Sequence, residues 1–328
     1  MLNEVSIEII RKCPNNCVHC SSLSDKDCTE IFRYNDFVSI INDAEKLGTK
    51  TICLSGGEPF LHPNIIEMIN YIHNMGINSN VYTSGIIFDG DMNYASLNKE
   101  LLYSVAGKVS KLIFNIESSN TDMYDKIMGT LGCFGLMRQS VKTANSLGIV
   151  TEAHFVPMKL NADEIELMVG FCKELGLSKL SFLRLVMHGR AQINEKEIAL
   201  STEDLAQVKN KLKSLQKQSD FDIRIGVPLL SNDNCHKCEA AKGKLNIRYD
   251  GCVFPCEVFK NDKGSILPNG LQPDNVYNAS LFDIYANSSY LKHIRDVSEQ
   301  YVCSKNTETC IGQCMINYKE EKLQDDKQ

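Results

Sequence analysis

The sequence lacks any long hydrophobic run. No apolar stretch approaches the roughly 18 residues that a membrane-spanning helix needs. The N-terminal segment MLNEVSIEIIRKC also lacks the apolar core and small-residue cleavage site of a secretory signal peptide. Because hydrophobic residues still make up 43% of the 328 residues, we expect a globular protein that resides in the cytosol and does not enter a membrane.

Excess positive charge is also absent. Lys and Arg number 35 against 41 Asp and Glu, which gives a net charge of −6 at neutral pH. No basic stripe with interleaved aromatic residues occurs along the chain. Since nucleic-acid binding requires a basic surface, this charge balance argues against a nucleic-acid partner.

Cysteine, in contrast, is abundant. The chain contains 14 cysteines and no secretion signal, and the cytosol keeps thiols reduced. A disulfide framework is therefore not expected, and metal binding becomes the better explanation. Three cysteines crowd into residues 13–20 and seven lie beyond residue 234, so two separate metal-binding regions are indicated.

Short apolar runs alternate with amphipathic patterns through most of the chain, which predicts βαβ units and a parallel sheet. Six such units favour an α/β fold with a partial (β/α)6 TIM-like barrel, open on one side. We expect this barrel over residues 1–226, a small loop-rich domain with a β-hairpin over 227–318, and a frayed tail over 319–328. The predicted strands are 5–10, 51–55, 80–84, 111–116, 151–156 and 180–186, and the predicted helices are 37–48, 65–76, 101–107, 134–148, 163–175 and 202–218.

The first cysteine group has the spacing C-x3-C-x2-C directly after the first strand, with Cys13, Cys17 and Cys20. Three thiolates on a tight loop can bind three irons of a cubane cluster and leave the fourth iron open. A zinc site that borrows a remote fourth ligand is the alternative. The tetrapeptide Gly56-Gly57-Glu58-Pro59 follows the second strand, where two glycines permit close backbone approach and a carboxylate can hold an ammonium group.

Together these two motifs resemble the radical S-adenosylmethionine (SAM) superfamily. The resemblance implies a partial barrel and a [4Fe–4S] cluster whose ligands are Cys13, Cys17 and Cys20. It implies that the open iron binds the methionyl group of SAM. It further implies reductive cleavage of SAM to methionine and a 5′-deoxyadenosyl radical, which abstracts a hydrogen atom from a substrate.

The same resemblance implies a set of residues that contact SAM at the mouth of the barrel. Ser84 stands where the family often has the Asn of T-N-G, and Asn115 and Glu117 stand where it often has S-x-D. For His19 the alternative is loop packing, and for Arg184 it is a surface salt bridge. The implied SAM-binding residues are His19, Gly56, Gly57, Glu58, Ser84, Asn115, Glu117 and Arg184.

The second cysteine group comprises Cys235, Cys238, Cys252, Cys256, Cys303, Cys310 and Cys314. Asp250-Gly251 predicts a hairpin turn, after which Cys252 and Cys256 would share one face of the second strand. The group resembles the SPASM and twitch extensions, which hold auxiliary iron–sulfur clusters in enzymes that modify peptides. Two cysteines of the full SPASM pattern are absent, so the resemblance implies one auxiliary [4Fe–4S] cluster, held by Cys235, Cys238, Cys256 and Cys314.

Two alternatives remain for this second group. The spacing Cys235-x2-Cys238-x13-Cys252 also matches the molybdenum-cofactor cyclases, which leaves the choice between Cys252 and Cys256 open. Cys252 and Cys310 are candidate catalytic hydrogen-atom donors, or ligands with Cys303 of a second, labile cluster. A structural zinc site is the other interpretation.

The resemblance implies an enzyme that acts on a peptide or protein, by cross-linking, epimerisation or oxidation of a ribosomally made precursor. Expected partners are the substrate and an electron donor such as flavodoxin or ferredoxin. A leader peptide would bind either the barrel itself or a separate leader-peptide-binding protein. Synthesis of a small molecule such as a molybdenum cofactor or tetrapyrrole is the second hypothesis. A non-catalytic, metal-stabilised scaffold is the third, although a scaffold has no need for an open coordination site.

Overall fold

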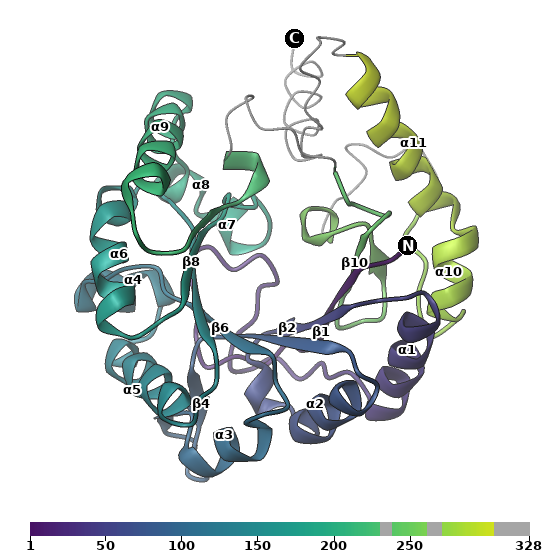
Figure 1. The fold of residues 1–328 in the computed structure, drawn as a ribbon, viewed down its shortest axis with the longest axis horizontal. Coiled ribbons are helices and arrows are strands. Elements are labelled where there is room, and N and C mark those ends of the chain that lie inside the picture. The colour runs from purple at the N-terminus through teal and green to yellow at the C-terminus, as the bar shows by residue number, and fades with distance from the viewer. Residues whose placement is uncertain (230–237, 261–270, 305–328) are drawn as a thin grey trace.

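The computed structural model describes residues 1–229, 238–260 and 271–304 (Figure 1). Within these ranges a nine-stranded sheet has the order β11-β10-β1-β2-β3-β6-β7-β8-β9. Neighbouring strands from β10 to β9 are parallel, and β11 is antiparallel to β10 at one edge. The strands are β1 (Glu4–Ile10), β2 (Thr51–Gly56), β3 (Asn78–Thr83), β6 (Lys111–Asn115), β7 (Thr151–Phe155), β8 (Lys179–Phe182), β9 (Ile223–Ile225), β10 (Lys244–Ile247) and β11 (Val253–Phe254).

Helices follow the parallel strands and lie around the outer side of the curved sheet (Figure 1). Helix α1 (Tyr34–Lys46) buries Phe37, Ile40, Ile41 and Ala44, the spacing that places apolar side chains on one helical face. A small hairpin of β4 (Ile86–Phe88) and β5 (Tyr94–Ser96) lies beside α5. The remaining helices are α2 (Ile65–Asn74), α3 (Lys99–Val105), α4 (Thr121–Met128), α5 (Cys133–Ser146), α6 (Ile165–Glu174), α7 (Arg190–Ile193), α8 (Glu195–Ile198), α9 (Thr202–Gln218), α10 (Leu281–Asn287) and α11 (Ser289–Ser304).

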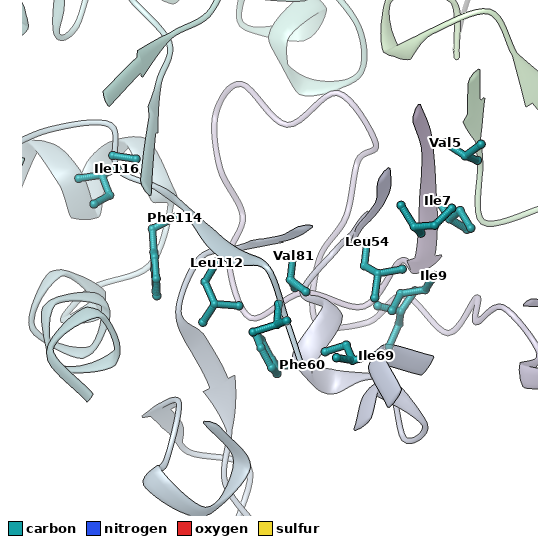
Figure 2. Close-up of a cluster of buried hydrophobic side chains, with 14 of the residues drawn as sticks. Val5, Ile7, Ile9, Leu54, Phe60, Ile69, Val81, Leu112, Phe114 and Ile116 are labelled. Carbon is teal, nitrogen blue, oxygen red and sulfur yellow. The ribbon is translucent and has the colours of Figure 1, made fainter. Parts of the chain in front are cut away.

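Strand alternation separates an apolar outer layer from a polar interior. Val5, Ile7 and Ile9 of β1 are fully buried in the core shared with the helices (Figure 2). Ser6 and Glu8 point to the other side and line an internal cavity. Successive side chains of a strand face opposite sides, so one strand supplies both the core and the lining of the barrel.

The predicted partial barrel is confirmed, and all six predicted strands are present. Two further parallel strands extend it. The three-residue β9 was not predicted because Ile-Arg-Ile is too short to form a recognisable pattern. Strand β10 is the first strand of the predicted hairpin, and its register from Glu4↔Lys244 to Ile7↔Ile247 joins it to β1.

The C-terminal region shares the hydrophobic core of the barrel. Val253, Phe254, Phe259, Leu281 and Ile284 are all buried within the same cluster of apolar side chains as β1 and β2. The described part of this region therefore packs on the barrel through apolar side chains. No helix within the described ranges combines the length and apolar character needed to cross a bilayer.

Candidate active site

A cavity of about 610 Å³ occupies the barrel interior, beside the carboxyl ends of β1, β2, β3 and β6. Cys13, Cys17 and Cys20 all line it, from the loop that follows β1. Other lining residues come from the turn after β2, from strand ends across the sheet and from residues 238–260. The cavity thus brings the N-terminal cysteine group together with part of the C-terminal region.

The cysteine loop is held from one side by helix α4. The backbone N–H of Asn16 donates to Met128 O at 3.0 Å, and that of Val18 donates to Ile127 O at 2.9 Å. Gly129 ends the helix with a positive φ of 66°, and a Cβ there would collide with the Asn16 carbonyl. A glycine is therefore required where helix and loop touch.

Arg190 holds the loop from the other side. Its Nε donates to Cys17 O at 2.8 Å, its Nη2 donates to Ser24 O at 2.6 Å, and its backbone N–H donates to Cys20 O at 2.9 Å. A Cβ on the preceding Gly189 would lie 2.6 Å from Cys20 O. The Gly189-Arg190 segment therefore shapes the cysteine loop.

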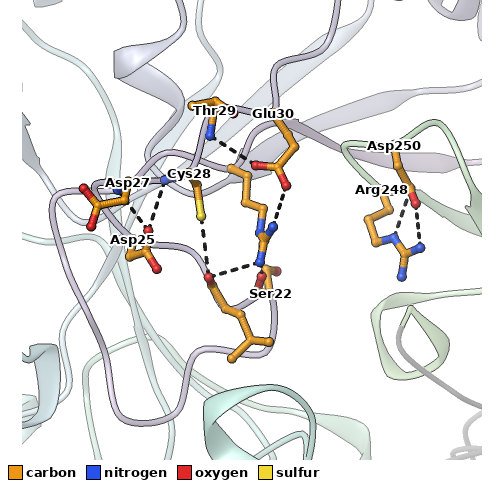
Figure 3. Close-up of polar contacts among 10 residues, drawn as sticks. Ser22, Asp25, Asp27, Cys28, Thr29, Glu30, Arg248 and Asp250 are labelled. Atoms are coloured by element: carbon orange, nitrogen blue, oxygen red, sulfur yellow. Dashed lines mark hydrogen bonds and ion pairs between the residues drawn. The ribbon is translucent and has the colours of Figure 1, made fainter.

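Further polar contacts stabilise residues 22–30, which follow the three cysteines (Figure 3). Arg11 Nη1 lies 2.5 Å from Glu30 Oε1, and Asp25 Oδ1 accepts from the backbone N–H groups of Asp27 and Cys28. Arg248 pairs with Asp250 at the adjacent hairpin turn, with Nη2 and Oδ2 2.6 Å apart. The contacts of Arg11 and Asp25 stabilise the segment that follows the three cysteines, and the Arg248–Asp250 pair stabilises the hairpin turn.

The chemistry of the three thiols fits a cationic cluster. Burial raises the pKa of Cys13 well above its ordinary value, and the charges of Cys17, Glu58 and Cys20 raise it further. Burial and then Cys20 also raise the pKa of Cys17. These shifts disfavour the thiolate forms of Cys13 and Cys17, so both residues would bind as thiolates only with metal charge beside them. Among the described residues no three candidate ligands converge to hold a single metal ion, whereas a cubane takes one thiolate on each of three irons.

Gly56 and Gly57 place the end of β2 against the start of the cysteine loop. Gly57 N–H donates to Ile10 O at 2.6 Å, and Glu58 N–H donates to Lys12 O at 2.9 Å. A Cβ on Gly56 would collide with the Ile10 carbonyl, and one on Gly57 with the Lys12 carbonyl. Both glycines also line the cavity, so the close backbone approach that the sequence predicts serves the loop as well as any ligand.

Glu58 is fully buried, and it lies behind the cavity wall and does not line it. Its Oε1 accepts from Thr83 Oγ1 at 2.7 Å, and its Oε2 accepts from both the backbone N–H and the Oγ of Ser84, at 2.8 and 2.7 Å. Burial raises the pKa of Glu58, and these hydrogen bonds oppose the shift. The carboxyl group therefore fixes the end of β3, where Ser84 itself lines the cavity.

The structure brings His19 together with the end of β6. His19 Nε2 lies 3.3 Å from Glu117 Oε1 and 3.5 Å from Asn115 Nδ2. His19 and Asn115 line the cavity, but Glu117 does not, because its Oε2 accepts from the backbone N–H of Val156 at 2.8 Å behind them. Arg184 lines the cavity on β8's side of the barrel.

The C-terminal cysteines divide into two environments. Cys238 and Cys256 line the cavity, whereas Cys252 is not among its lining residues. Asn275 Nδ2 donates to Cys252 Sγ at 3.5 Å, and burial together with Asp250 raises the pKa of this thiol. Strand β11 spans only two residues and contains neither cysteine, so the expectation that both lie on the second strand of the hairpin is wrong. Cys235, Cys310 and Cys314, and the side chain of Cys303, lie outside the described residues.

The family model of the radical SAM superfamily matches residues 7–172, just over half of the 328 residues. The chain therefore belongs to the radical SAM superfamily. Members of this superfamily are enzymes that use a [4Fe–4S] cluster and SAM, so the cluster chemistry predicted from the two motifs is confirmed at the level of the family.

Similarity to individual proteins extends beyond that segment. The PqqA peptide cyclase of Gluconobacter oxydans is 21% identical over 282 residues, which cover 85% of this chain and 75% of that protein. The AdoMet-dependent heme synthase of Methanosarcina barkeri is 21% identical over 310 residues, covering 90% and 85%. The crystal structure of Streptococcus suis SuiB bound to the precursor peptide SuiA has the same fold, with a TM-score of 0.72 at 16% identity over 90% of this chain and 67% of SuiB.

Proposed function

We propose that this enzyme modifies a peptide or protein by radical chemistry, in a reaction such as cross-linking, epimerisation or oxidation of a side chain. The observation that carries the proposal is the single cavity that both the N-terminal cysteine loop and Cys238 and Cys256 line. The similarity to PqqA peptide cyclases along most of both chains supports a peptide substrate.

Cys13, Cys17 and Cys20 would ligate the cluster that binds SAM. When bound, the cluster and SAM supply one-electron cleavage of the C–S bond, giving methionine and a 5′-deoxyadenosyl radical that takes a hydrogen atom from the substrate. The protein's own residues would orient the cluster ligands and surround the space in which SAM and the substrate bind. Arg190 and helix α4 hold the loop whose three cysteines line the cavity.

For SAM itself we propose the lining residues His19, Gly56, Gly57, Ser84, Asn115 and Arg184 as binding contacts. Their backbone and side-chain polar atoms surround the same space as the cysteines. Glu58 and Glu117 would act indirectly, because Glu58 holds Ser84 and Glu117 lies against His19. Both carboxylates are then positioning residues for the SAM site.

We propose one auxiliary [4Fe–4S] cluster with Cys235, Cys238, Cys256 and Cys314 as ligands. The shared cavity supports Cys238 and Cys256. The hydrogen bond from Asn275 and the adjacent Asp250 favour a structural role for Cys252 over that of ligand or hydrogen-atom donor. Cys310 stays the candidate donor.

We propose two partners for such a reaction. A low-potential electron donor such as flavodoxin or ferredoxin would reduce the cluster, and a separate protein would present a leader peptide. The cytosol suits this chemistry, because it keeps the cluster thiols reduced.

A second candidate is a small-molecule reaction, which the similarity to AdoMet-dependent heme synthase over most of both chains favours. The two candidates differ in the source of the abstracted hydrogen. Peptides encoded next to the gene of this protein would be prepared in deuterated medium and incubated anaerobically with reconstituted enzyme, reductant and SAM. We expect deuterium to enter 5′-deoxyadenosine. If only added tetrapyrroles stimulate SAM cleavage, the peptide proposal is wrong.

A further inference from the structure

Asn15 has an unusual environment for a buried polar side chain. It is 1% exposed and lies midway between Cys13 and Cys17. Within the described part of the chain, neither Oδ1 nor Nδ2 of its carboxamide has a hydrogen-bond partner. A buried amide atom without a partner destabilises the fold, and this side chain has two such atoms.

The position of the carboxamide indicates what would pair with it. Asn15 lines the same cavity as the three cysteines. Its backbone N–H donates a hydrogen bond to the Cys13 thiol and opposes the rise of the pKa of that thiol. Asn15 therefore lies beside the Cys13 sulfur. The neighbouring Asn16 differs, because its side chain is exposed and only its backbone contacts helix α4.

We propose that the Asn15 carboxamide is a positioning residue for the SAM-binding cluster, and that its Nδ2–H donates a hydrogen bond to a cluster sulfur. This proposal rests on the ligand assignment made above. Hydrogen bonds to cluster sulfurs stabilise the electron-rich reduced state and so raise the reduction potential. The amide would thereby make the cluster easier to reduce.

Asn15→Leu keeps the size of the side chain and removes the donor. Asn16→Leu, at the next residue of the same loop, is the matched control. Midpoint potentials would be measured by redox titration followed by electron paramagnetic resonance. The spectrum of a Cys13/Cys17/Cys20 triple alanine variant identifies any auxiliary signal for subtraction. We expect the midpoint potential to fall by roughly 59 mV in Asn15→Leu, which corresponds to an about tenfold lower ratio of reduced to oxidised cluster at a given potential. The midpoint potential of Asn16→Leu should stay unchanged.

Two further readouts separate this role from others. Because the amide makes no hydrogen bond within the described part of the chain, cluster-free Asn15→Leu should melt at the same temperature as the wild type or higher. A lower melting temperature would mean that the amide stabilises the fold, and would overturn the proposal. An unchanged potential with weaker SAM binding would assign the amide to SAM instead, and would also overturn it.

Asn15→Asp provides a second test if the leucine variant binds no cluster, since Asp has the same shape but no N–H. Its potential should likewise fall. If the triple alanine variant keeps the SAM-responsive signal, the ligand assignment itself has failed, and that result is distinct from an unchanged potential in the Asn15 variants.

Discussion

Lys260 Nζ lies 2.6 Å from Glu8 Oε1, and both side chains are buried. Ser22 Oγ joins the pair, 2.7 Å from Nζ and 2.9 Å from the same carboxylate oxygen. Burial alone would lower the pKa of Lys260, but Glu8 raises it above its ordinary value, so the ammonium group stays charged. This contact connects the segment after β11 with β1 and with the loop that carries the cluster cysteines.

Lys260→Met should destabilise the protein strongly. The variant leaves the Glu8 carboxylate buried without its partner, and breaking a buried pair in this way costs about 3–5 kcal/mol. Urea unfolding of the cluster-free protein measures the change. Lys292→Met is the control, because the Lys292–Asp296 pair is on the surface and contributes less than about 1 kcal/mol. Equal stability of Lys260→Met and wild type would contradict the importance of this contact.

Gly57→Ala should displace the cysteine loop and reduce iron binding. The added methyl group would collide with the Lys12 carbonyl, which is backbone and cannot rotate away. Iron and sulfide content after reconstitution, together with SAM binding by calorimetry, measures the effect. Gly170→Ala is the matched control, since nothing lies within 4 Å of a Cβ on that helical glycine. Full iron content in Gly57→Ala would show that the loop tolerates the shift.

Cys256→Ala should lose the auxiliary cluster, whereas Cys252→Ala should retain it. Of these two cysteines only Cys256 lines the cavity, and the Cys252 sulfur accepts a hydrogen bond from Asn275. The comparison is made in the Cys13/Cys17/Cys20 triple alanine background, where any remaining iron and its Mössbauer signal belong to the auxiliary site. Loss of iron in Cys252→Ala alone would reverse the assignment and favour the spacing of the molybdenum-cofactor cyclases.

Acid stability should depend on His154. Burial, aided by Arg224, Lys111 and Lys244, lowers the pKa of this imidazole to about 3. Between pH 6.5 and 3 the unfolded chain takes up a proton at His154 that the folded chain does not. The stabilisation is therefore complete above pH 6.5 and is lost as the pH falls toward 3.

The matching experiment compares urea midpoints of cluster-free protein at about pH 7 and pH 5, an interval that spans the ordinary histidine pKa of about 6.5. His154→Gln should lose less stability across this interval than the wild type does. His73→Gln, on the exposed side of α2, should behave like the wild type. An unchanged acid sensitivity in His154→Gln would mean that the neutral imidazole does not control the transition.

Sequence patterns were sufficient for the barrel because six strands and their helices each carry a clear local period. The cluster motif was equally clear, since ligand spacing on one loop is a local property. Contacts between distant segments were not predictable in this way. Arg190 holds the Cys17 and Ser24 carbonyls across more than 160 residues, and no sequence pattern encodes that pairing.

The role of Glu58 illustrates the same limit. Its place in the GGE motif is evident from the sequence, but its direction is set by Thr83 and Ser84 on the neighbouring strand. Likewise, the parallel pairing of β10 with β1 depends on the surface that the folded barrel presents. Such features are decided by tertiary packing and not by the local sequence.

The most direct test is anaerobic formation of 5′-deoxyadenosine from SAM by reconstituted, reduced enzyme, quantified by chromatography. The wild type and Cys28→Ala should form it, because Cys28 lies in the same loop but does not line the cavity. Cys17→Ala and the Cys13/Cys17/Cys20 triple alanine variant should form none while they keep the auxiliary iron. Product formation by the triple variant would contradict the assignment of these three cysteines as ligands of the SAM-binding cluster.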